Sequence, residues 1–143
     1  MDMKTHQLLP IFILLIIILI STAGCRTSSS EDDENNAVAA MQQKVLGRWN
    51  LVKFTEETTV GNQPPEVINN NPQNIYFEFL SNGKVRTNAE GEEEYSYEVK
   101  VNNTMILWQK EQKILELTNN KFTFSNSATE GNTTYKQTYF LTR

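Results

Sequence analysis

A strict alternation of apolar and polar side chains constrains the fold of this chain more than any other feature. It is clearest at residues 95–101, which read Tyr-Ser-Tyr-Glu-Val-Lys-Val, and it recurs at 77–79 and 122–125. Successive side chains of a β-strand point to opposite faces, so a period of two predicts strands with one buried and one solvated face.

Turn residues divide this region into strands. Residues 81–84, Ser-Asn-Gly-Lys, predict a hairpin, because Asn-Gly suits the positive φ angles of a type I′ turn. Asn-Asn pairs at 102–103 and 119–120 mark two further turns, and two polar stretches, 58–74 and 126–133, are predicted as loops. The eight predicted strands are 49–57, 75–80, 85–88, 95–101, 104–109, 114–118, 122–125 and 135–143.

One helix is predicted before the strands, at residues 37–46. Val38, Met41 and Val45 recur at helical spacing, and Gly47 follows as a stop signal. Short strands without intervening helices indicate a sandwich or a barrel, and a meander of eight closes into a barrel without exposed edges. The predicted fold class is therefore all-β, a small eight-stranded antiparallel up-and-down barrel with a short N-terminal helix.

The N-terminus is typical of a bacterial export signal. A short polar segment with Lys4 precedes an apolar run at 8–20, which is shorter than the roughly 20 residues of a membrane-spanning helix. Residues 21–25, Ser-Thr-Ala-Gly-Cys, resemble the lipobox of bacterial lipoproteins. This resemblance implies that residues 1–24 are cleaved off and that Cys25 carries the lipid; the alternative is an ordinary signal peptide with a chance cysteine.

Residues 25–36 are predicted to form a flexible acidic tether between the lipidated cysteine and a domain at 37–143. The stretch has high charge and no apolar residue after Cys25, so it cannot contribute to a packed core. Its Ser-Glu-Asp-Asp-Glu run at 30–34 resembles the export signal of surface-exposed Bacteroidetes lipoproteins, which implies a lipid-anchored protein of the outer membrane and the cell surface. A solvated spacer is the plainer alternative.

Two residue types are nearly absent from the chain. Its one histidine, His6, lies in the predicted signal, and its one cysteine, Cys25, is the predicted lipid carrier. Catalysis by Ser-His-Asp or Cys-His groups, zinc sites of the His or Cys type and disulfides are thereby excluded from the predicted mature chain. We expect no enzyme, no metal and no cofactor. With a net charge of −4 and no basic patch, nucleic acid is not an expected partner.

The start of the first strand resembles a known family. Gly47-Arg48-Trp49 looks like the Gly-x-Trp motif of lipocalins, and residues 79–85 and 115–122 resemble the lipocalin-like domain of Bacteroidetes lipoproteins. The resemblance covers residues 45–143. It implies that Trp49 lies at the closed end of the barrel and that Arg143 covers its ring, so that Gly47, Trp49 and Arg143 are structural. The chain departs from typical lipocalins in its short length and in lacking a disulfide and the Thr-Asp-Tyr motif.

Two functions remain open at this point. In the first, the barrel binds a small apolar ligand at the cell envelope, and tyrosine hydroxyls supply polar groups. In the second, the barrel is filled and docks to an envelope protein. Residues 105–108 of the strand predicted at 104–109 are apolar on both faces, so one face is then either an exposed patch or a surface covered by the predicted helix. In both, lipid on Cys25 attaches the chain to a membrane. The candidate ligand-lining residues are Phe77, Phe79, Tyr95, Tyr97, Trp108, Phe122, Phe124 and Tyr139.

Overall fold

The computed structural model describes residues 29–143, of which Asp33–Arg143 form one compact unit. The predicted signal at 1–24 and the predicted lipidation site Cys25 lie outside the described residues. The helix within the described range is not long and apolar enough to cross a membrane.

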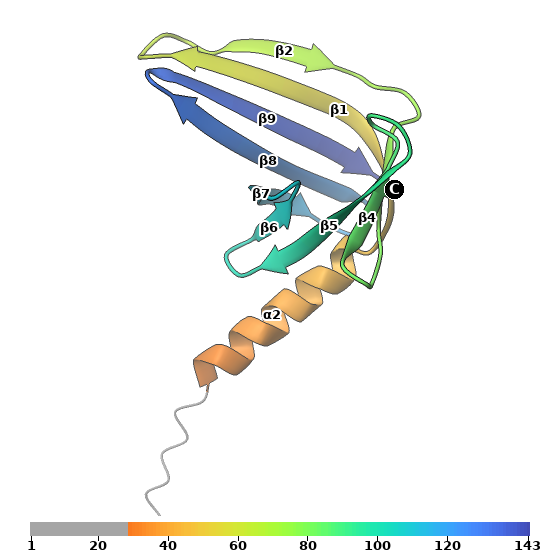
Figure 1. The fold of residues 1–143 in the computed structure, drawn as a ribbon. Helices are drawn as coiled ribbons and strands as arrows, with labels where there is room; N and C mark the ends of the chain where they lie inside the picture. Colours follow the sequence, from red (N-terminus) through yellow and green to blue (C-terminus); the bar gives the residue numbers. More distant parts are fainter. Residues whose placement is uncertain (1–28) are drawn as a thin grey trace, which may run out of the picture. The chain divides into compact units, whose positions relative to one another are not determined.

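The described chain is one helix followed by nine antiparallel strands (Figure 1). Eight of the strands, β1 and β3–β9, follow one another up and down, and pairing of β1 with β9 closes them into a barrel. The predicted fold class is confirmed. The elements are α2 (Ser29–Val45), β1 (Gly47–Val60), β2 (Glu66–Asn70), β3 (Tyr76–Phe79), β4 (Lys84–Thr87), β5 (Glu93–Lys100), β6 (Thr104–Leu107), β7 (Lys110–Leu117), β8 (Lys121–Glu130) and β9 (Thr133–Thr142).

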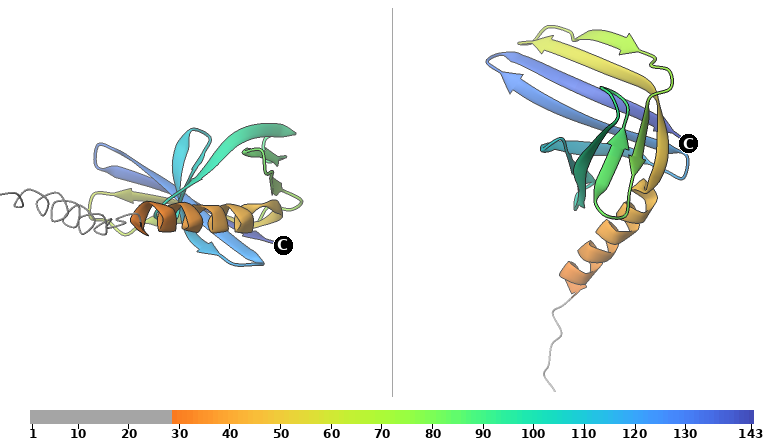
Figure 2. Two further views of the ribbon diagram at one scale, coloured as in Figure 1. Left: turned by 90° about the horizontal axis from the view of Figure 1, so that it is seen from below. Right: turned by 45° about the vertical axis from the view of Figure 1, so that its right-hand side comes forward.

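Three strands are longer than the rest. β1, β8 and β9 have 10 to 14 residues, whereas β3, β4 and β6 have four each. Figure 2 shows the long strands continuing past the short ones, with β2 alongside β1. β2 pairs with residues 54–58 of β1 and is a ninth strand outside the barrel.

The predicted loop at 58–74 was wrong over about half of its length, and the one at 126–133 over most of its length. β1 continues to Val60 and β2 occupies 66–70, while β8 and β9 meet at a turn at Gly131-Asn132. Residues 61–70 and 127–130 are exposed throughout. Because both faces of the sheet are solvated there, the sequence shows no alternation to reveal these strands.

Helix α2 begins at Ser29, well before the predicted start at Ala37, so residues 29–36 of the predicted tether are helical. The acidic residues Asp32, Asp33 and Glu34 lie in its first two turns. Negative side chains near the N-terminus stabilise a helix, because they interact favourably with the positive end of its dipole. Only the later part carries an apolar face: Val38 and Met41 pack against the core.

Two bulges change which side chains point into the barrel. The register shifts between Leu51 and Lys53 in β1 and between Ile114 and Glu116 in β7. The extra residue at each bulge is an apolar side chain turned outward, Val52 at 45 % exposure and Leu115 at 50 %.

One predicted hairpin and one predicted strand differ in detail. The hairpin at 81–84 is present, but only Gly83 has a positive φ and its N–H bonds to the Leu80 carbonyl at 3.2 Å, which makes a type I turn ending in a left-handed glycine. The strand predicted at 104–109 ends at Leu107, because Trp108 and Gln109, with φ of 54° and 59°, form a two-residue hairpin turn to β7.

Candidate functional site

Trp49 closes one end of the barrel, which we call the closed end. Its side chain has no exposed surface, and its indole Nε1 donates a hydrogen bond to the Val45 carbonyl at 2.8 Å. The guanidinium carbon of Arg143 lies 4.0 Å from the centre of the Trp49 ring. Trp49 and Arg143 thus make the contact that the lipocalin resemblance implied, and cation–π attraction adds to the packing.

Arg143, which follows β9, also forms hydrogen bonds to the end of α2 and to the turn at Asn119. Its Nη1 and Nη2 donate to the carbonyls of Leu46 and Lys44, at 2.7 and 3.3 Å, where the end of α2 leaves carbonyl oxygens unpaired. Its Nε donates to the Asn119 carbonyl at 2.7 Å. Gly47 has a φ of 103°, and a Cβ there would lie 3.3 Å from Arg143 Nη1. Glycine at this position therefore gives both the left-handed backbone and the room for arginine.

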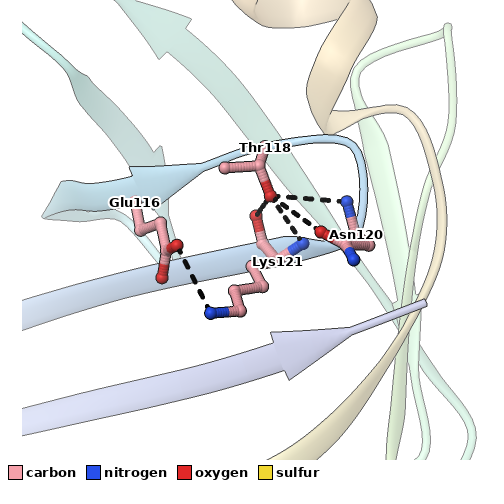
Figure 3. A network of polar contacts seen from close by, with 4 residues as sticks. All are labelled: Glu116, Thr118, Asn120 and Lys121. Atoms are coloured by element: carbon pink, nitrogen blue, oxygen red, sulfur yellow. Dashed lines mark hydrogen bonds and ion pairs between the residues drawn. The ribbon is translucent and has the colours of Figure 1, made fainter.

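The hairpin that presents the Asn119 carbonyl is held by its own polar contacts (Figure 3). The Thr118 hydroxyl accepts hydrogen bonds from the backbone N–H groups of Lys121 and Asn120, at 3.0 and 3.4 Å, and donates to Asn120 Oδ1 at 3.2 Å. Such side-chain bonds fix tight turns. The Asn-Asn pair predicted as a turn from the sequence is thus part of the Arg143 site.

Four of the eight candidate ligand-lining residues belong to packed parts of the core, not to a cavity. The Tyr97 hydroxyl donates to the Leu80 carbonyl at 2.9 Å and accepts from Gln42 Nε2 at 3.0 Å, and burial raises its pKa. Edge-to-face and tilted ring contacts of 5.0 to 5.6 Å link the set. The four are Phe79, Tyr97, Phe122 and Phe124; they are buried against one another, and they do not line the cavity at the other end of the barrel.

The other end of the barrel, the open end, holds a cavity of about 570 Å³. This lies within the range of roughly 300–1,000 Å³ that is usual for small-molecule sites. The other four predicted residues line it, together with Phe54, which was not predicted. The aromatic wall is formed by Phe54, Phe77, Tyr95, Trp108 and Tyr139.

Trp108 is central to this wall. Its ring centre lies 5.5 Å from that of Tyr139, 5.9 Å from that of Phe77 and 6.2 Å from that of Tyr95. The hairpin turn that carries it has the left-handed conformation that glycine and asparagine usually occupy, and a bulky residue there is strained. The turn thus places a large aromatic ring at the cavity.

Polar side chains share the cavity with the aromatic wall. Glu56 of β1 and Gln137 of β9 face each other across the strand pair, and Gln137 Nε2 donates to Glu56 Oε1 at 3.4 Å. Asn126 Nδ2 donates to the fully buried Gln112 at 3.2 Å. Glu90 and Lys110 complete the charged part of the lining.

The sequence reasoning missed Phe54 and Glu56 for a definable reason. Strict alternation from Trp49 would place Leu51, Lys53 and Thr55 inside the barrel. The bulge at Val52 shifts the alternation by one residue, so that Phe54 and Glu56 lie inside instead. The adjacent apolar pair Leu51-Val52, which interrupts the alternation, was the available signal.

The pKa of the Tyr139 hydroxyl reflects the surroundings of this side chain in the cavity. Burial raises its pKa to about 12, with additional contributions from the negative charges of Glu56 and Glu90. The negative charges of both carboxylates thus act on the same hydroxyl group.

The apolar run at residues 105–108 does not form an exposed patch. Met105 and Leu107 are fully buried inside the barrel, Ile106 is half-buried, and Trp108 turns into the cavity. The exposed patch considered for a protein partner is absent from this strand.

No family model, curated protein or solved structure matches this chain. The strand number, antiparallel order and closure of the barrel are consistent with a lipocalin-like fold.

Proposed function

We propose that the chain is a lipid-anchored envelope protein whose barrel binds a small, largely apolar ligand at its open end. The single observation that carries this proposal is the aromatic cavity of about 570 Å³. The protein's own packing leaves apolar surface of this cavity uncovered. Burying such surface against a ligand is favourable by about 25 cal/mol per Å².

The contrast between the two ends supports the proposal. The closed end fills its interior with aromatic rings, whereas the aromatic rings of the open end line a cavity. A chain that needed only a stable core would gain by filling both.

Native mass spectrometry of the protein released from its own host membrane tests the proposal, and we expect a retained small molecule. Gln137→Phe, which extends into the cavity, should remove that molecule, because the ring occupies its space. Lys136→Phe is the matched control: Lys136 contacts Glu57, and neither residue lines the cavity. A wild-type protein without any bound molecule, or equal retention in both variants, would contradict the proposal.

The location is a separate part of the proposal. It rests on the lipobox at 21–25 and on the acidic run that follows. Cys25→Ala should abolish incorporation of labelled fatty acid, since the sulfur that receives the lipid is gone. Equal labelling of the mutant would refute the anchor.

Surface exposure needs its own experiment, because Asp32, Asp33 and Glu34 lie in α2 and not in a loop. Replacing the acidic run by alanine should keep lipidation and reduce digestion by protease added to intact cells. Unchanged digestion would leave the run as a spacer.

A second candidate function is docking of an extended segment from an envelope protein. It is favoured by β2, which pairs with β1 on one side only and exposes Val67 and Ile68 at 46 % and 53 %. A strand with a free edge can accept a further strand through its backbone. Val67→Lys with Ile68→Lys should abolish such docking and leave cavity binding unchanged.

A further inference from the structure

We infer that the ligand of the open end is an organic cation, with an apolar body against the aromatic wall and a positively charged group at the carboxylates of Glu56 and Glu90. This inference rests on the proposed function, since it names the chemical class that the same cavity takes.

The aromatic wall is the first reason. Phe54, Trp108 and Tyr139 present π-systems to one cavity, with ring centres 4.8 Å apart for Phe54 and Tyr139 and 5.5 Å apart for Trp108 and Tyr139. The face of an aromatic ring attracts a cation, and sets of such rings bind alkylammonium groups. A neutral apolar ligand would also pack here, so the wall alone does not decide.

The charges decide. Two carboxylates, Glu56 and Glu90, and one ammonium group, Lys110, line the cavity. Among the described residues no ion pair within 4.0 Å neutralises either carboxylate, whereas the neighbouring Glu57 lies outside the cavity and is paired with Lys136 at 3.2 Å. The cavity therefore has an excess of negative charge, which a cation compensates and a fatty acid does not.

The position of Glu56 is fixed by the fold. It follows the bulge in β1, so its side chain lies on the inner face beside Phe54. Its carboxylate accepts a hydrogen bond from Gln137, which leaves further acceptor positions for a ligand. Glu90 approaches from the loop between β4 and β5. The two carboxylates thus come from separate elements around the cavity.

Three probes with one skeleton test the inference on the full chain in lipid nanodiscs, with binding to empty nanodiscs subtracted. They are phenylhexyl-trimethylammonium, its neutral isostere with carbon in place of nitrogen, and phenylheptanoate. Binding is read from the fluorescence of Trp108, with Trp108→Phe as the blank, because Trp49 is the chain's other tryptophan and is fully buried.

The cation should bind about tenfold more tightly than the neutral isostere, and the carboxylate should bind most weakly. Glu56→Gln keeps the shape and the bond to Gln137 but should remove most of that preference. Glu57→Gln, one residue along on the outer side, should leave it unchanged.

Each other outcome has a distinct meaning. Equal binding of the cation and the isostere would overturn this inference and leave the proposed function intact. Tightest binding of phenylheptanoate would overturn it in favour of Lys110 as the dominant charge. Absence of binding by all three probes would contradict the proposed function itself.

Discussion

At the closed end of the barrel, Trp49 is fully buried and its indole N–H is bonded to the Val45 carbonyl, whereas at the open end Trp108 lies beside a cavity of about 570 Å³. Both tryptophans contact other aromatic rings. The difference lies in what surrounds them. The end of α2 and Arg143 contact the first, and a strained two-residue turn carries the second.

This difference separates stability from binding along one barrel. The closed end combines buried rings with hydrogen bonds between chain segments far apart in sequence, which makes it the cooperative part of the core. The open end leaves apolar surface and unpaired carboxylates, which contribute little to folding and provide contacts for a ligand. Substitutions at the two ends should therefore have opposite consequences.

The largest expected effect is that of Trp49→Ala. Truncating a buried tryptophan costs about 3–5 kcal/mol, out of a total of roughly 5–15 kcal/mol for an ordinary domain. Urea unfolding of residues 33–143 should show a domain that is marginal or unfolded. If the variant unfolds at the urea concentration of the wild type, the closed end is not the centre of stability.

Arg143→Ala should have the next largest effect, about 2 kcal/mol. The variant loses the contact with the Trp49 ring and three hydrogen bonds to main-chain carbonyls, two of them at the end of α2. Arg143→Lys should recover only part, because an ammonium group cannot donate to all three carbonyls in the same geometry. Full recovery by lysine would show that charge alone matters.

Trp108→Gly should change the free energy of unfolding by about 1 kcal/mol or less. Glycine relieves the left-handed strain of the turn, which offsets the loss of ring contacts. Binding of an apolar probe should nevertheless fall markedly, as the ring at the cavity is lost. A large loss of stability would contradict the separation of the two ends.

The smallest expected effect is on pH dependence. The pKa of Tyr139 is raised from 10.0 to about 12, so the folded state holds this proton more tightly than the unfolded state. Its contribution to stability is present in full below pH 10 and is lost as the pH rises through about 12. The difference in tyrosinate absorbance between wild type and Tyr139→Phe should titrate near pH 12; a midpoint near 10 would place the hydroxyl in solvent.

The closed end could be predicted from the sequence more fully than the open end. Trp49 and Arg143 were named from a motif, and Gly47 fits because its left-handed φ and the approach of Arg143 both exclude a larger residue. The hydrogen bonds of Arg143 to the end of α2 were not predicted, since they join residues about a hundred positions apart.

The cavity at the open end could not be predicted, because its shape depends on features that the alternation of apolar and polar residues does not reveal. The bulge at Val52 turned Phe54 and Glu56 inward, and the turn at Trp108-Gln109 contains none of the residues that usually mark such turns. Strand β2 and the end of β8 are exposed on both faces, so no alternation marks them and the sequence predicted loops there. The barrel was thus predictable and the shape of its cavity was not.

The most direct test compares the two tryptophans in one spectrum. Residues 33–143, labelled with ¹⁵N at tryptophan, give two indole N–H signals, since the chain contains two tryptophans, Trp49 and Trp108. On titration with phenylhexyl-trimethylammonium, the Trp108 signal should move and saturate while the Trp49 signal stays in place. Movement of both signals, or of Trp49 alone, would contradict an open end that binds and a closed end that only stabilises.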